Sequence, residues 1–279
     1  MVLTKKELVI RGSNTREMGM DIVLNSKELT KQPVVIFCHG YKGFKDWGCW
    51  NLVAEEFASQ GFNFVKFNFS HNGVTINKPT DFDDLEAFGN NNYSKELFDL
   101  NAVIDWVVSD ENEFKDLFDT SNIYVIGHSR GGGIVSLASA KDPRIKKAIT
   151  WASVYNLTER LPGDTEEWKQ DGVVYQTNGR TKQEMPLYFQ FYENTQMNIA
   201  ELNIEKIGKK ITNPFCIIHG SVDTVVPVEE AEKLNDLIPN SQIIIIENAG
   251  HTFGSNHPFQ FNELPSDLVK LVGESILFL

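Results

Sequence analysis

The sequence predicts an α/β protein with a mostly parallel central sheet flanked by helices, an antiparallel N-terminal hairpin and a small cap insertion. Short apolar runs alternate with helical segments through most of the chain, and such alternation is typical of strands joined by right-handed crossovers. The alternation stops between residues 154 and 213 and then resumes. With 279 residues, 41% hydrophobic and 23% charged, the composition is that of one soluble domain, 1–279, that contains the insertion.

The elements follow from local patterns. Two strand-forming runs, 6–10 and 18–24, flank Gly12, Ser13 and Asn14, which predicts the hairpin. Apolar runs that suit strands covered on both faces follow it; they lie at 33–38, 62–69, 122–126, 145–151, 214–218 and 243–246. Helices are predicted between these strands, as where apolar residues recur at helical spacing after Asn92; they lie at 47–59, 92–109, 132–141, 228–237 and 267–278.

The segment 154–213 is polar and contains several glycines and prolines. It is too long for an ordinary connection, so we interpret it as a cap or lid insertion. It also holds seven aromatic residues, which could line an apolar substrate pocket or pack the insertion onto the body; they are Tyr155, Trp168, Tyr175, Tyr188, Phe189, Phe191 and Tyr192. The sequence leaves both interpretations open.

A Gly-His-Ser-Arg-Gly motif at residues 127–131 lies between a predicted strand and a predicted helix. This context is typical of a nucleophile elbow, a tight turn in which small residues must flank the serine. The turn exposes the serine at the N-terminus of a helix, whose dipole favours developing negative charge. The motif therefore predicts Ser129 as a nucleophile. The alternative is a glycine-rich turn whose serine has no catalytic role.

An acid and a base follow two later strands. Asp223 comes after the strand at 214–218, and His251 comes after the strand at 243–246. An acid in this position can orient an imidazole, which can then deprotonate a serine hydroxyl. The order Ser129, Asp223, His251 is one of the known orders of a serine triad, and it predicts acyl transfer to water.

A serine nucleophile also needs two backbone N–H donors aimed at the developing oxyanion. The residue after the nucleophile, Arg130, supplies the first in this prediction. The second is expected from the loop after an earlier strand, where the pattern His-Gly-Tyr at residues 39–41 favours Tyr41.

The remaining histidines have less specific positions. His39, His128 and His219 are expected to be structural, because they sit in turns at strand ends or beside the serine. His71 could line the pocket or be solvated. His257 is a rival base, but it precedes a proline and lacks a position directly after a strand.

The chain resembles the α/β-hydrolase superfamily over nearly its full length, and within it the dienelactone-hydrolase, acyl-peptidase and cinnamoyl-esterase branch. The motifs that carry the resemblance lie at residues 39–44, 127–132, 219–227 and 250–253. The resemblance implies the α/β-hydrolase fold, an insertion after the sixth strand that covers the site, and hydrolysis of carboxylic esters of small or aryl substrates. Dienelactone hydrolases use a cysteine nucleophile, so Ser129 argues against a dienelactone substrate.

Two other functions stay open: an acyl-aminoacyl or dipeptidyl-type peptidase on the same triad, and a non-catalytic ligand-binding protein of this fold. A net charge of −12 excludes a basic footprint for nucleic acid or anionic lipid. Metal-ligand spacings and phosphate loops are missing from the sequence, so no metal and no cofactor is expected.

The expected location is the cytoplasm, because the N-terminus lacks a signal-peptide pattern, no run is long enough to cross a bilayer, and the three cysteines are interpreted as reduced. The expected partner is a small-molecule ester, with no membrane and no nucleic acid, and a homodimer is left open.

Overall fold

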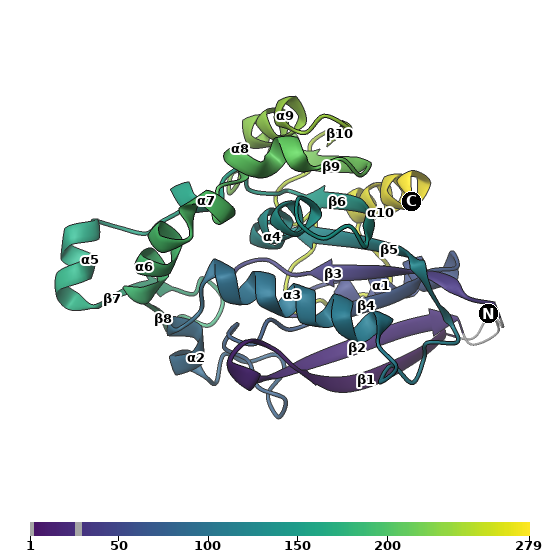
Figure 1. Cartoon of the computed structure of the whole chain (residues 1–279), viewed down its shortest axis with the longest axis horizontal. Helices are drawn as coiled ribbons and strands as arrows, with labels where there is room; N and C mark the ends of the chain where they lie inside the picture. The colour runs from purple at the N-terminus through teal and green to yellow at the C-terminus, as the bar shows by residue number, and fades with distance from the viewer. Residues whose placement is uncertain (1–2, 26–29) are drawn as a thin grey trace.

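The computed structural model describes residues 3–25 and 30–279, through which an eight-stranded sheet runs in the order β1-β2-β4-β3-β5-β6-β9-β10 (Figure 1). The first two pairings, β1 with β2 and β2 with β4, are antiparallel, and all later pairings are parallel. The strands are β1 (Leu3–Arg11), β2 (Glu17–Asn25), β3 (Gln32–Cys38), β4 (Asn63–Phe67), β5 (Phe118–His128), β6 (Ile145–Trp151), β9 (Phe215–Gly220) and β10 (Ser241–Ile246). The predicted fold class and hairpin are confirmed.

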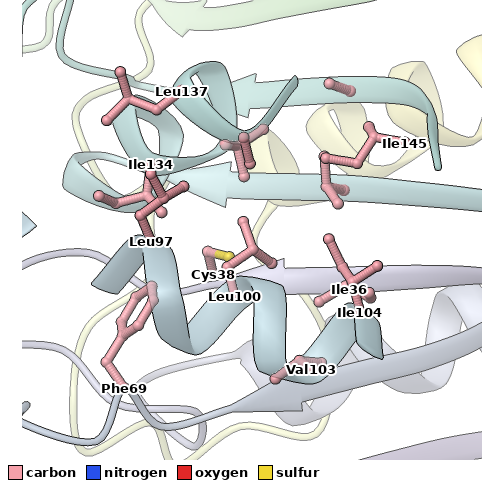
Figure 2. Close-up of a cluster of buried hydrophobic side chains, with 14 of the residues drawn as sticks. Ile36, Cys38, Phe69, Leu97, Leu100, Val103, Ile104, Ile134, Leu137 and Ile145 are labelled. Carbon is pink, nitrogen blue, oxygen red and sulfur yellow. The ribbon is translucent and has the colours of Figure 1, made fainter. Parts of the chain in front are cut away.

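Helices cover both faces of the sheet. One face packs on α1 (Trp50–Ser59) and α10 (Ser266–Phe278), and the other on α3 (Tyr93–Val108), α4 (Arg130–Ser139) and α9 (Val228–Leu237). Successive strand residues point to opposite faces. In β3, accordingly, Ile36 and Cys38 join the core under α3 and α4 (Figure 2), whereas Phe37 joins the core under α1. A continuous apolar run is therefore what a strand at this position requires.

Two helices begin two or more residues from their predicted starts. The helix expected at 47–59 starts at Trp50, because Gly48 takes a left-handed conformation, φ 58°, in the preceding turn. The helix expected at 132–141 starts at Arg130, directly after the sharp turn at the serine. A further short helix, α2 (Leu85–Gly89), was not predicted because five residues are too few for a periodic pattern.

Buried charges fix the loop that follows β3. Lys66 of β4 is fully buried and pairs with Asp21 of β2 and with Asp46 of the loop. Lys45 also pairs with Asp21, at 2.8 Å between Nζ and Oδ2. Its backbone N–H donates to the side-chain oxygen of Asn68 at 2.7 Å. Charges buried in this way must stay paired, so the loop is anchored close to the sheet.

The segment 154–213 has its own secondary structure and extends from the sheet on the left of Figure 1. Its main elements are α5 (Thr165–Asp171), the antiparallel pair β7 (Val173–Thr177) and β8 (Glu184–Tyr188), α6 (Gln190–Met197), α7 (Ile199–Leu202) and α8 (Ile204–Ile207). It packs on the body where α6 meets α3 and β8 meets α2. Within residues 3–25 and 30–279, no helix has the length and apolarity needed to cross a bilayer.

Candidate active site

The predicted nucleophile lies on a strained turn between β5 and α4. Ser129 has φ 55° and ψ −120°, a conformation that non-glycine residues keep only when their surroundings impose it. The turn is closely packed: a Cβ at Gly127 would lie 2.3 Å from the carbonyl oxygen of Gly131, and one at Gly131 would lie 2.4 Å from the carbonyl oxygen of Cys38. Both positions therefore require glycine, as the motif indicates.

The predicted acid and base are hydrogen-bonded to each other. The Nδ1 atom of His251 lies 2.7 Å from Oδ2 of Asp223. The other carboxylate oxygen of Asp223 accepts the backbone N–H groups of Val225 and Val226 at 2.8 and 2.9 Å. A carboxylate on Nδ1 leaves the Nε2 atom of the imidazole free to accept a proton, which is the tautomer that a general base needs.

The environment of Asp223 favours its ionised form. Burial alone would raise the pKa of this carboxyl, but hydrogen bonds from His219, His251 and the Val226 N–H outweigh burial and lower the pKa far below its ordinary value. The Nε2–H of His219 donates to the carbonyl oxygen of Val226 at 2.8 Å, and the same nitrogen lies 3.4 Å from Oδ2 of Asp223. The structural interpretation of His219 therefore includes support of Asp223.

The serine and the histidine line one cavity of about 190 Å³. The elbow and the histidine loop are also tied directly, because Nε2–H of His128 donates to the carbonyl oxygen of His251 at 2.9 Å. Burial lowers the pKa of His128 to about 3, so this imidazole stays neutral. The complete lining consists of Gly40, Tyr41, Lys42, Gly43, Trp47, Trp50, His128, Ser129, His251 and Thr252.

Of the two predicted oxyanion donors, Tyr41 lines this cavity, and Arg130 directly follows Ser129, which also lines it. Arg130 is the first residue of α4, and an N–H at that position has no acceptor within its helix. Tyr41 lies in the loop after β3, which approaches the elbow so closely that a Cβ at Gly40 would lie 3.0 Å from Cβ of Ser129. His39 holds the loop: its Nδ1–H donates to the Gly40 carbonyl at 2.9 Å.

Two other histidines are held away from this cavity. His71 is buried, so it is not solvated, and its Nδ1 lies 2.7 Å from the hydroxyl of Ser70. The Nδ1 atom of His257 accepts the backbone N–H of Gly48 at 3.0 Å, and its ring stacks on Trp47. Neither residue lines the cavity. The structure therefore does not support His257 as the base.

The aromatic walls of the cavity come from a part of the chain that sequence reasoning missed. Trp47 and Trp50 line it, whereas the seven aromatic residues of segment 154–213 do not. Trp168 instead is fully buried against Phe189, Phe191 and Tyr192. The sequence does contain a signal for these two wall residues, because both tryptophans directly follow the loop that carries Tyr41, the second predicted oxyanion donor.

Acidification is expected to destabilise the protein through its buried neutral histidines. Burial lowers the pKa of His39 and of His71 to about 4, and that of His128 to about 3. Each binds a proton more readily when unfolded, so its stabilising effect is complete above the unfolded value of 6.5 and is lost as the pH falls toward the folded value. By about pH 5 one such histidine costs about 2 kcal/mol. Asp99 acts in the opposite direction. Burial raises its pKa to about 6, so this carboxyl binds a proton more readily in the folded state, and its protonation offsets part of the loss.

The measurement is the free energy of unfolding in urea between about pH 7 and about pH 5. Wild type should lose stability across this interval, and His39→Gln should lose less than wild type. Equal losses in the two proteins would contradict a neutral buried imidazole at residue 39.

The fold and the arrangement at the sheet edge define the chain as an α/β-hydrolase. It belongs to the BD-FAE family, whose model matches residues 20–238. Est1E from Butyrivibrio proteoclasticus, solved with ferulic acid bound, superposes with a TM-score of 0.73 at 19% identity, over 97% of this chain and 98% of that chain. GrgF from Penicillium sp. sh18 gives 0.72 at 14%, over 99% and 97%. The mouse alpha/beta hydrolase domain-containing protein 10 gives 0.69 at 18%, over 97% and 96%.

The curated relatives match over a short stretch only. A pimeloyl-[acyl-carrier protein] methyl ester esterase of Aliivibrio fischeri is 29% identical over 65 residues, which are 23% of this chain and 25% of the esterase. The chain thus matches about a quarter of the length of this relative. At identities of 14% to 19%, the solved structures show only the fold. The activity must therefore be inferred from the residues of the site.

Proposed function

We propose that the chain is a serine hydrolase that cleaves carboxylic esters of small or aryl substrates. The observation that carries the proposal is the Asp223–His251 hydrogen bond of 2.7 Å beside a cavity that Ser129 also lines. Membership of the BD-FAE family supports hydrolysis as the general chemistry. A structural neighbour described as the esterase domain of a Rhodothermus marinus protein supports it further.

The proposed reaction passes through an acyl-enzyme. Nε2 of His251 removes the Ser129 proton as Oγ attacks the ester carbonyl, and the N–H groups of Tyr41 and Arg130 stabilise the resulting oxyanion. The imidazolium, stabilised by Asp223, then protonates the departing alcohol. Water attacks the acyl-enzyme with His251 again as base, which releases the acid and restores the serine.

We propose that residues 154–213 act as a cap on a single catalytic domain, 1–279. The support is a contact at the cavity rim, where the Lys42 ammonium donates to the carbonyl oxygen of Thr177 in β7 at 3.2 Å. A second contact joins the segment to α2, where the hydroxyl of Tyr188 donates to Glu86 at 2.5 Å. A cap held in this way would limit the length of the bound substrate.

The proposed substrate class rests on the size and the walls of the cavity. A volume of about 190 Å³ beside Tyr41, Trp47 and Trp50 suits a small or planar aromatic group. We propose a small-molecule ester as the partner, in the cytoplasm. The free and buried state of Cys38, Cys49 and Cys216 is compatible with a reducing compartment.

A panel of p-nitrophenyl esters with graded acyl chains tests the substrate class. We expect kcat/KM to be highest for acetyl, butyryl or aryl acyl groups and to fall at least about tenfold for long acyl chains, which exceed the cavity. Trp47→Ala should lower this preference for short and aryl groups. Negligible rates on every ester, with rapid cleavage of aminoacyl amides, would favour the peptidase instead.

The non-catalytic alternative is tested by a fluorophosphonate probe, which forms a covalent adduct only with an activated serine. We expect stoichiometric labelling, with the adduct located at Ser129 by mass spectrometry. A folded protein that stays unlabelled would favour a binding protein of this fold.

A further inference from the structure

The side chain that follows the predicted nucleophile is enclosed by aromatic rings. The guanidinium carbon of Arg130 lies 3.8 Å from the ring centroid of Tyr41, 5.3 Å from that of Tyr93 and 5.5 Å from that of Phe191. The side chain is 12% exposed, and its Nη1 atom pairs with Glu96 at 3.4 Å. A desolvated guanidinium over an aromatic face gains more from this contact than an exposed one.

This stack joins the two residues whose backbone N–H groups are the proposed oxyanion donors. The backbone of Arg130 is fixed as the first residue of α4. Tyr41 lies in a loop, and its buried hydroxyl has no hydrogen-bond partner among the residues that the structure describes. The ring of Tyr41 is held instead by contacts on its faces, with Arg130 at 3.8 Å and with Phe88 at 5.5 Å between ring centroids.

We propose that the Arg130 side chain is a positioning residue that clamps the Tyr41 ring and thereby sets the direction of the Tyr41 N–H. This inference rests on the proposed function, since it concerns the oxyanion site of the same reaction. Donors aligned before the reaction lower the barrier most, and a stack between the two donor residues fixes their separation. The aromatic wall also connects this site to segment 154–213, because Phe191 belongs to α6.

Glu96 anchors the clamp from α3. It is 3% exposed, and its Oε1 atom accepts the side-chain N–H of Asn91 at 2.7 Å in addition to Arg130. The carboxylate balances the guanidinium charge and orients its plane. Removal of Arg130 alone would leave this carboxylate buried without its cation, which is strongly destabilising, so a test must change both residues.

The central experiment uses the double variant Arg130→Met/Glu96→Gln, which replaces the ion pair with uncharged side chains of similar length. We expect kcat for a p-nitrophenyl ester to fall about 10- to 100-fold, less than the loss of a whole oxyanion donor, while KM stays within about threefold. The affinity for phenylboronic acid, which forms a tetrahedral adduct with an activated serine, should weaken together with kcat/KM. Arg130→Lys keeps the charge without the planar stack and should give an intermediate kcat.

A second pair of variants tests the ring without changing the ion pair. Both Tyr41→Phe and Tyr41→Leu keep the backbone N–H, but only the first keeps an aromatic face for Arg130. We expect the leucine variant to have a kcat about tenfold below that of the phenylalanine variant. These variants keep the proposal testable if the double variant does not fold.

The matched control is Arg144→Met/Asp142→Asn, which removes another arginine–carboxylate pair, 2.7 Å apart, just before the amino-terminal end of β6 and so at the end of the strand away from Ser129. It should lower Tm without changing kcat. A double variant at Arg130 and Glu96 with wild-type kcat and wild-type phenylboronic acid affinity, but a lower Tm, would overturn the clamp. This outcome differs from a failure of the proposed function. If the chain were not a serine hydrolase, the wild-type protein itself would not be labelled by the fluorophosphonate probe.

Discussion

Replacement of Ser129 with alanine is expected to lower kcat for p-nitrophenyl acetate by about 10⁵- to 10⁶-fold, because no acyl-enzyme can form. The folded structure should persist. The alanine removes one hydroxyl from a turn whose geometry is set by Gly127 and Gly131, and it keeps the Ser129 backbone N–H bond to the carbonyl oxygen of Trp151. The measurements are initial rates at saturating ester and Tm by calorimetry.

A serine on an exposed helix end provides the control for this substitution. Ser59→Ala in α1 removes a hydroxyl that donates to the Glu56 carbonyl and accepts from the side chain of Gln60, and it should leave kcat at the wild-type value. Turnover by Ser129→Ala within about tenfold of wild type would show that another group performs the chemistry.

The second large effect is expected at Gly127, where substitution acts through the backbone. A Cβ there would lie 2.3 Å from the Gly131 carbonyl oxygen and 2.6 Å from the Gly132 nitrogen. The elbow must therefore shift in Gly127→Ala, at a cost of about 3 kcal/mol in unfolding free energy. A displaced elbow also misaligns Ser129, so kcat should fall at least about 100-fold.

Gly273→Ala is the matched control for this prediction. A Cβ at Gly273, an exposed position inside α10, would meet no atom within 4 Å from other parts of the described chain. Alanine there should stabilise the protein by up to about 1 kcal/mol, through helix propensity. If Gly127→Ala kept the wild-type urea midpoint and kcat, the close approach at the elbow would be refuted.

Most of the sheet could be predicted because its local signals agree with its tertiary context. The strand at 145–151 and the helix at 228–237 were predicted to the residue, and prolines lie just before both. Ser129, Asp223 and His251 could be placed on one sheet edge because each follows a parallel strand. That inference needs only chain order and strand direction.

Features that depend on distant partners could not be predicted. Lys66 lies in an apolar run, and its burial makes sense only beside Asp21 and Asp46, which belong to other segments. The stack of Arg130 on Tyr41 joins residues that are far apart in the sequence. Side-chain packing across such separations leaves no periodic pattern, and the same is true of the cavity walls.

The position of segment 154–213 divides its possible evolutionary changes into two kinds. It leaves the end of β6 and re-enters at the start of β9, which is the parallel neighbour of β6. Its later part, with α7 and α8, must therefore carry the chain back along the sheet, and Leu202, Ile204 and Ile207 are buried in the core there. Its earlier part, with α5 and the β7–β8 pair, does not carry the chain back along the sheet, although Trp168 and Leu187 are also buried in the core. If the segment acts as the proposed cap, insertions or deletions in the exposed loops of that earlier part would alter which molecules reach Ser129, while the sheet and its flanking helices stay intact.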